Sequence, residues 1–173
     1  MARSGGARPH RLKRRRLTIA TWAEFAAAAP DLVKRGARLL GIGVAYIGTT
    51  ARDGSPRVHP FTPLIGGGRL LAFIGKHTVK YGNLCRDPRY SIHAMLGKDD
   101  EEFMLIGRVV LSDDWATSMQ AAVEARKISM TSRNHVPFEF MVERAHWAIW
   151  EGLGTPNIRR RSERWQALAR NDG

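Results

Sequence analysis

Apolar positions along the chain predict a protein built mainly from short strands. Some of these runs are continuously apolar and others alternate with polar residues, as strands buried on two faces or on one face do. The predicted strands are 39–49, the segment that carries Arg57, 69–74, 90–96, 103–111, 138–142 and 146–150. Short turns separate the early strands, which favours an antiparallel arrangement over a doubly wound parallel sheet.

Helical spacing occurs between these strands. Thr21 and Glu24 have the spacing of a capping box, and the helical region that follows ends near Gly36. A short basic helix begins at Thr78 and stops before Pro88, because the proline ring disfavours helix in the preceding residue.

A third helix begins at Ser112 or Asp113 and runs to about residue 128, with an apolar stripe that we interpret as core packing. Together these elements predict a mainly β (α+β) fold. Its form is a six-stranded antiparallel barrel with peripheral helices.

Positive charge is concentrated at the two ends of the chain. The formal net charge is +12, and seven of the 28 Lys and Arg residues lie in the first sixteen residues, which contain no acid. We expect a basic tail at 1–18, the barrel domain at 19–155 and a basic C-terminal arm at 156–173. The tail is either a nucleic-acid-binding arm or a solvated extension, and we favour the extension because cations alone read no base sequence.

The chain contains no apolar run near the length of a membrane span and no secretory signal. Its single cysteine, Cys85, excludes an internal disulfide and a cysteine-rich metal site. We therefore expect a soluble cytoplasmic protein, with Cys85 as a small apolar core residue. Carboxylates and histidines at metal-binding spacing are absent from the sequence, and no metal site is predicted.

A candidate phosphate cradle lies between Gly54 and Arg89. The Asp53-Gly54 pair predicts a tight hairpin turn into the strand with Arg57, and two prolines make that strand an edge or a bulged strand. Thr78 and Lys80 stand at the start of the short helix. An arginine, a lysine, a hydroxyl and the positive end of a helix dipole suit a phosphate group.

His59 alternates with Arg57, so both side chains should point to the same face of the strand. Two interpretations of this histidine have equal weight. It either lies beside a bound cofactor or is a hydrogen-bonded histidine at a sheet edge.

The order of these motifs, DGSPRVHPF (53–61), LLAFIG (70–75) and TVKYGNLCRDPR (78–89), resembles the pyridoxamine 5′-phosphate oxidase-like flavoproteins. The resemblance implies a split β-barrel, a homodimer with its cofactor at the interface, and FMN as that cofactor. Trp150 resembles the late tryptophan strand of the oxidases, in which late-chain residues of the partner subunit cover the cofactor. Ordinary barrel packing is the other interpretation of Trp150, and we favour it slightly. The implied cofactor-binding residues are Arg57, Val58, His59, Pro60, Phe73, Ile74, Thr78 and Lys80.

The part of the family pattern that recognises the vitamin B6 substrate does not match this sequence. The segment 158–165 lacks the substrate-binding histidine of the oxidases, and Glu102 stands where they have a glutamine. We therefore predict an FMN-dependent oxidoreductase acting on an unidentified small molecule, with no catalytic side chain assigned. The alternatives are an F420-dependent reductase on the same fold, or a non-enzymatic flavin- or haem-binding module with His59 or His146 as candidate iron ligands.

Overall fold

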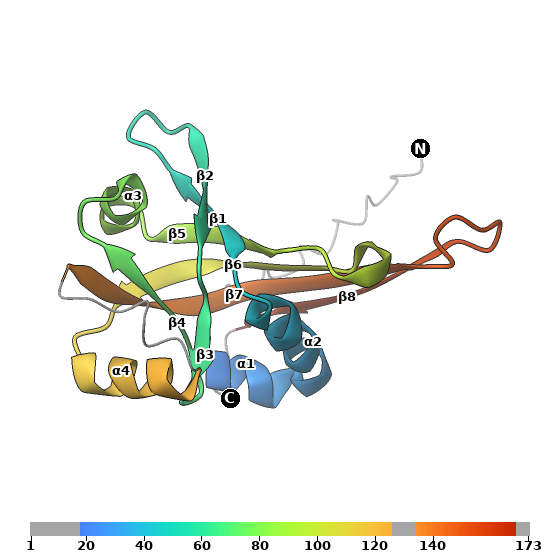
Figure 1. Cartoon of the computed structure of the whole chain (residues 1–173), viewed down its shortest axis with the longest axis horizontal. Helices are drawn as coiled ribbons and strands as arrows, with labels where there is room; N and C mark the ends of the chain where they lie inside the picture. Colours follow the sequence, from blue (N-terminus) through green and yellow to red (C-terminus); the bar gives the residue numbers. More distant parts are fainter. Residues whose placement is uncertain (1–17, 126–133, 169–173) are drawn as a thin grey trace, which may run out of the picture.

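The structure, a computed structural model, describes residues 18–125 and 134–168. Within these residues the helices are α1 (Trp22–Ala28), α2 (Pro30–Gly41), α3 (Val79–Arg86) and α4 (Trp115–Glu124), and η1 (Lys98–Asp100) is a 3-10 turn. The strands are β1 (Ala45–Thr50), β2 (Pro56–Phe61), β3 (Leu64–Gly66), β4 (Arg69–Gly75), β5 (Arg89–Ala94), β6 (Glu102–Leu111), β7 (His135–Glu151) and β8 (Arg159–Gln166). Figure 1 shows the helices grouped around one strongly bent sheet.

All eight described strands belong to a single antiparallel sheet with the order β2-β1-β5-β6-β7-β4-β3, and β8 also pairs with β7. The α+β class is therefore confirmed, and so is the position of β2, the Arg57 strand, at a sheet edge. The predicted count of six strands is wrong, and the sheet does not close into a barrel because its two ends, β2 and β3, do not pair.

The additional strands have identifiable causes. β3 has only three residues, too few for a hydrophobic period to reveal it. β8 lies in the predicted C-terminal arm, where its run of charges gives no strand signal, and backbone pairing to β7 over residues 159–166 forms it. The two predicted strands at 138–142 and 146–150 are one continuous strand, β7. The hairpin that joins β7 to β8 projects away from the rest of the molecule (Figure 1).

The first predicted strand began too early, and Gly36 does not end a helix. α2 continues through Gly36 to Gly41, and Leu39 and Leu40 are buried from this helix. Gly36 lets the helix approach the sheet, since a Cβ atom at this position would lie 2.2 Å from the Cζ atom of Phe103. The close contact with Phe103 comes from a distant part of the chain, so local periodicity could not indicate it.

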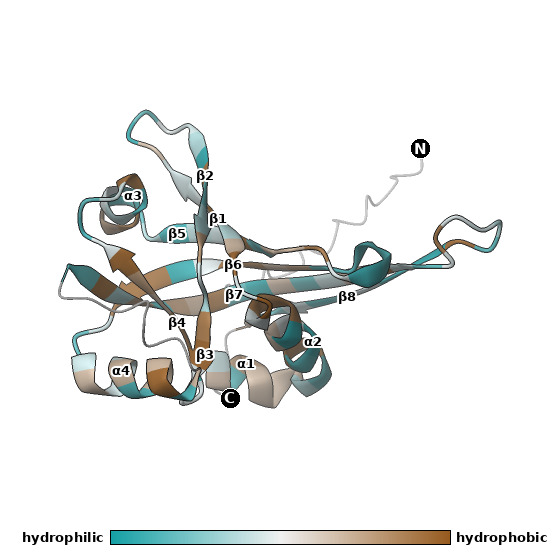
Figure 2. Ribbon diagram, in the orientation of Figure 1, coloured by the Kyte–Doolittle hydropathy of each residue, from teal (hydrophilic) through white to brown (hydrophobic). Residues whose placement is uncertain are grey.

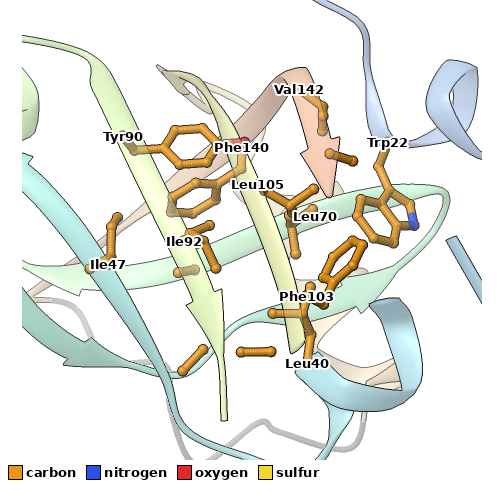
Figure 3. Packing of buried hydrophobic residues seen from close by; sticks show 14 of the residues in the cluster. Trp22, Leu40, Ile47, Leu70, Tyr90, Ile92, Phe103, Leu105, Phe140 and Val142 are labelled. Carbon is orange, nitrogen blue, oxygen red and sulfur yellow. The ribbon is translucent and has the colours of Figure 1, made fainter. Parts of the chain in front are cut away.

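The main core lies between the sheet and the first two helices. Figure 3 shows side chains of β5, β6 and β7 meeting Trp22 of α1 and Leu40 of α2. A smaller cluster forms where α4 covers β3 and β4, with Ala121 and Ala122 against Leu64 and Leu71. α4 packs as predicted, but its N-cap is Asp114, whose carboxylate accepts the Thr117 N–H at 2.9 Å.

Polar and apolar segments are separated along the sheet, with apolar residues in β4 and mostly hydrophilic residues in β8 (Figure 2). Cys85 is exposed, which corrects its prediction as a core residue. The predicted tail at 1–18 falls almost entirely outside the described residues. None of the described helices is long and apolar enough to span a membrane.

Candidate functional site

A hollow of about 240 Å³ opens between β2, β4 and the start of α3, and is called here the α3 hollow. Five of the eight predicted cofactor-binding residues line it. They are Pro60, Phe73, Ile74, Thr78 and Lys80. The remaining walls come from Val44, Phe61, Thr62, Ala72, Gly75 and His135.

Thr78 sets the geometry of this hollow by capping α3. Its Oγ1 accepts a hydrogen bond from the Tyr81 N–H at 3.3 Å and donates one to the Gly75 carbonyl at 2.8 Å. The hydroxyl group is therefore engaged by its own helix. The N–H groups of Val79 and Lys80 lie in the first turn, where an α-helix supplies no acceptor. These amides, rather than the Thr78 hydroxyl, are the donors left for an anion at this helix end.

Lys80 links α3 to the sheet edge. Its Nζ atom donates to the carbonyl oxygen of Pro60 at 2.6 Å, and burial lowers the pKa of its amine. An ammonium group carries three N–H donors, so the group can bind an anion while keeping this bond. At the edge of β2, the Pro60 carbonyl is therefore already occupied by Lys80.

His59 lies close to two cations, although it does not line the α3 hollow. Its Nε2 atom is buried and has no hydrogen-bond partner among the described residues. The pKa of His59 is lowered first by burial and then by the positive charges of Lys80 and Arg57. His59 therefore lies in an electropositive surrounding, with a buried nitrogen that has no partner among the described residues.

Arg57 and Val58 line a different hollow, of about 380 Å³, formed by residues of β1, β2 and β5. Thr49 and Arg89 also line this second hollow. Arg57 does not line the α3 hollow. Its positive charge instead lowers the pKa of His59. Of the eight predicted residues, five line the α3 hollow, two line this second hollow, and His59 lines neither.

The sequence did not indicate Thr62 or His135 as site residues. His135 reaches the hollow because it begins β7, whose register places it opposite Gly75 of β4. That pairing joins segments 60 residues apart, and no local motif marks it. Within 18–125 and 134–168, no three His, Cys, Asp or Glu side chains gather in a way that could hold a metal ion.

Solved structures share this architecture with the chain. A NimC/NimA family protein from Clostridium acetobutylicum is 22% identical, with 75% of this chain and 91% of that protein aligned and a TM-score of 0.55. A pyridoxamine 5′-phosphate oxidase-related, FMN-binding protein from Nostoc punctiforme is 13% identical over 82% of this chain and 96% of its own, with a TM-score of 0.53.

A haem-binding protein from Mycobacterium smegmatis is 18% identical and has a TM-score of 0.56 over 75% of this chain. The aligned part spans 57% of that protein's length. No protein-family profile matches the sequence, and no curated protein does. The chain therefore shares the split-barrel fold of the pyridoxamine 5′-phosphate oxidase-like proteins, and at these identities the likeness concerns the fold.

Proposed function

We propose that the protein is an FMN-dependent oxidoreductase that acts on a small molecule. The observation that carries the proposal is the α3 hollow. Five predicted residues line it, and two of them, Thr78 and Lys80, lie at the start of α3. The related FMN-binding protein from Nostoc punctiforme, with the same fold, agrees with this cofactor class. Its low identity leaves the substrate open.

The residues fit a phosphorylated cofactor. Lys80 supplies a charge, the first-turn amides of α3 supply fixed donors, and the buried Nε2 of His59 is a further polar atom that lacks a partner. Phe73 and Ile74 provide an apolar wall suited to a flat ring system. When bound, FMN would supply the hydride or electron transfer, while the protein holds and orients it.

The size of the α3 hollow favours a site completed by a second subunit. Pockets for drug-sized ligands measure roughly 300–1,000 Å³, and this hollow measures about 240 Å³. One subunit would therefore hold the phosphate end and leave the ring partly uncovered. We propose that a homodimer encloses the rest.

Titration with FMN, followed by its visible absorption and fluorescence, tests the cofactor. Lys80→Ala should weaken FMN binding at least about tenfold, or on the order of 1.4 kcal/mol, because it removes the charge at the helix start. Lys34→Ala is the matched control, since it deletes an exposed lysine from α2 and should leave binding unchanged. Binding of F420 but not FMN would keep the site and change the enzyme class. Absence of both would refute the proposal.

A haem-binding module is the second candidate. His59 and His146 each have a buried Nε2 without a partner among the described residues, and the Mycobacterium smegmatis neighbour binds haem. A hemin titration in which a Soret band appears, and disappears in His59→Ala or His146→Ala but not in Lys80→Ala, would favour this function over FMN chemistry.

A further inference from the structure

A second hollow, of about 500 Å³, lies on β6, β7 and β8 and is called here the β8 hollow. It shares no lining residue with the α3 hollow. Strand register arranges its floor in two rows across the sheet, Ile106–Arg144–Gln166 and Met104–His146–Arg164. A register that aligns side chains in rows places them on one face, because neighbours directly opposite in a sheet point the same way.

Three nitrogen-bearing side chains of the two rows, those of Arg144, His146 and Arg164, lie close together. His146 of β7 stands directly opposite Arg164 of β8. Arg144, two residues before His146 on β7, is the diagonal neighbour of Arg164. Side chains directly opposite have Cβ atoms about 5 Å apart, and diagonal neighbours stay within reach of long side chains. Two guanidinium groups and an imidazole can therefore contact a single bound group.

The two arginines are not neutralised by any described residue, and burial lowers the pKa of His146, which favours its neutral imidazole. Arg144 and Arg164 form no ion pair with any residue in the described ranges, and no carboxylate lines the hollow. The nearby acid, Glu102, is already bound by Arg160 at 2.8 Å. His146 also keeps its Nε2 atom buried and without a partner among the described residues. Buried polar atoms are almost always hydrogen-bonded, so this nitrogen indicates a missing partner.

Apart from Gln166, the other side chains that line the hollow are apolar. Met104 and Ile106 line one side, and Trp165 lies beneath, packed against Phe25 of the core. A bare inorganic anion would leave this apolar area in contact with water. An organic molecule with an acidic group at one end would use both parts of the hollow.

We propose that the β8 hollow is a separate binding site for a small organic acid, whose carboxylate lies between Arg144 and Arg164 beside His146 and whose apolar body lies on Met104 and Ile106. The site is separate from the flavin proposal because the two hollows share no lining residue, although both include part of β7. It assigns a role to the C-terminal arm, since Arg164 and Gln166 come from β8.

Benzoate is the probe, with benzamide as its neutral analogue and inorganic phosphate as the bare anion. Isothermal titration should show that benzoate binds more tightly than either comparison ligand. The imidazole ¹⁵N signal of His146 should shift on benzoate binding, because Nε2 gains its partner. Arg164→Gln should weaken benzoate binding at least tenfold.

Arg161→Gln is the matched control, because Arg161 lies on the same strand but pairs opposite Ile149, outside both rows. This variant should bind benzoate as the wild type does, and circular dichroism should show both variants folded. Equal binding by Arg164→Gln, or phosphate binding as tight as benzoate binding, would overturn the proposal. Loss of FMN binding in Arg164→Gln would assign the hollow to the cofactor site, and a His146-dependent Soret band with hemin would assign it to haem.

Discussion

Gly36 lies on the face of α2 that packs against the ring of Phe103, which is fully buried. We expect Gly36→Ala to lower the free energy of unfolding by about 1–2 kcal/mol, because overpacking costs about 1–3 kcal/mol and the gain in helix propensity returns at most about 1. Urea denaturation measures the change.

Gly41→Ala is the control for this helix. A Cβ atom at Gly41 would meet no atom within 4 Å, so the substitution should be neutral or slightly stabilising. If Gly36→Ala were as stable as Gly41→Ala, the result would contradict the close contact between Gly36 and the Phe103 ring.

His59 reports the electrostatics of the α3 hollow. Burial and the charges of Lys80 and Arg57 hold its pKa below the usual 6.5. The unfolded chain therefore takes up the proton more readily, and this residue's contribution to stability is present at high pH and declines as the pH falls through 6.5. A proton NMR titration should give a midpoint below 6.5.

The same titration tests the cofactor site at the level of one atom. A bound phosphate brings negative charge near His59 and should raise its pKa, and Lys80→Ala should raise it as well by removing a cation. Lys34→Ala should leave the midpoint where it is. A midpoint unaffected by FMN under conditions where FMN binds would place the phosphate away from this cluster.

At the scale of elements, α3 is held to β1 by one buried polar pair. Asn83 donates from Nδ2 to the Thr49 Oγ1 at 3.0 Å, and both residues are buried. Thr49→Val keeps the shape but removes the acceptor, leaving a buried donor that costs about 1–3 kcal/mol. We expect lower stability and faster hydrogen exchange of the α3 amides.

Ser91→Ala, on the exposed side of the neighbouring strand β5, is the comparison and should alter neither measurement. If the amide protons of α3 exchanged at the wild-type rate in Thr49→Val, the helix would be held by its other contacts, which include the Arg86 guanidinium bonded to the Thr50 carbonyl. In that case Leu84, its buried leucine, would be the stronger anchor.

The elements that sequence could predict are those with strong local signals. The capping box at Thr21 forms as expected, with the Glu24 N–H bonded to Thr21 Oγ1 at 3.1 Å, and α3 begins at its Thr78 cap. β8 could not be predicted, because its charged residues are held by pairing with β7. Long-range pairing has no local signature.

The candidate site also combines residues that local patterns predicted with residues that only strand pairing brings in. Lys80 and Thr78 were predicted from a helix start, and Phe73 from an apolar strand, and all three line one hollow. His135 was missed because only the register of β4 and β7 brings it there. Arg57 was grouped with the others by sequence order, but its side of β2 lines a separate surface.

For the whole molecule, the proposed homodimer would cover apolar residues that one subunit leaves exposed. Tyr46 of β1, Met95 after β5 and Trp150 of β7 are 44%, 42% and 38% exposed. Trp147, on the same strand as Trp150, is instead buried and donates from Nε1 to Glu101 at 2.7 Å. Of these two tryptophans, Trp150 is therefore the one accessible to a partner.

Trp150→Glu places a charge on this exposed surface and should convert a wild-type dimer to monomer in sedimentation velocity, because burying an unpaired carboxylate in an interface is costly. FMN binding should weaken with it even though Lys80 is intact, since in the proposed homodimer the second subunit would complete the small α3 hollow. Val123→Glu, on the exposed face of α4, adds the same charge elsewhere and should remain dimeric. A monomeric wild type that binds FMN tightly would show instead that a single subunit encloses the cofactor, and that the 240 Å³ hollow widens when the flavin enters.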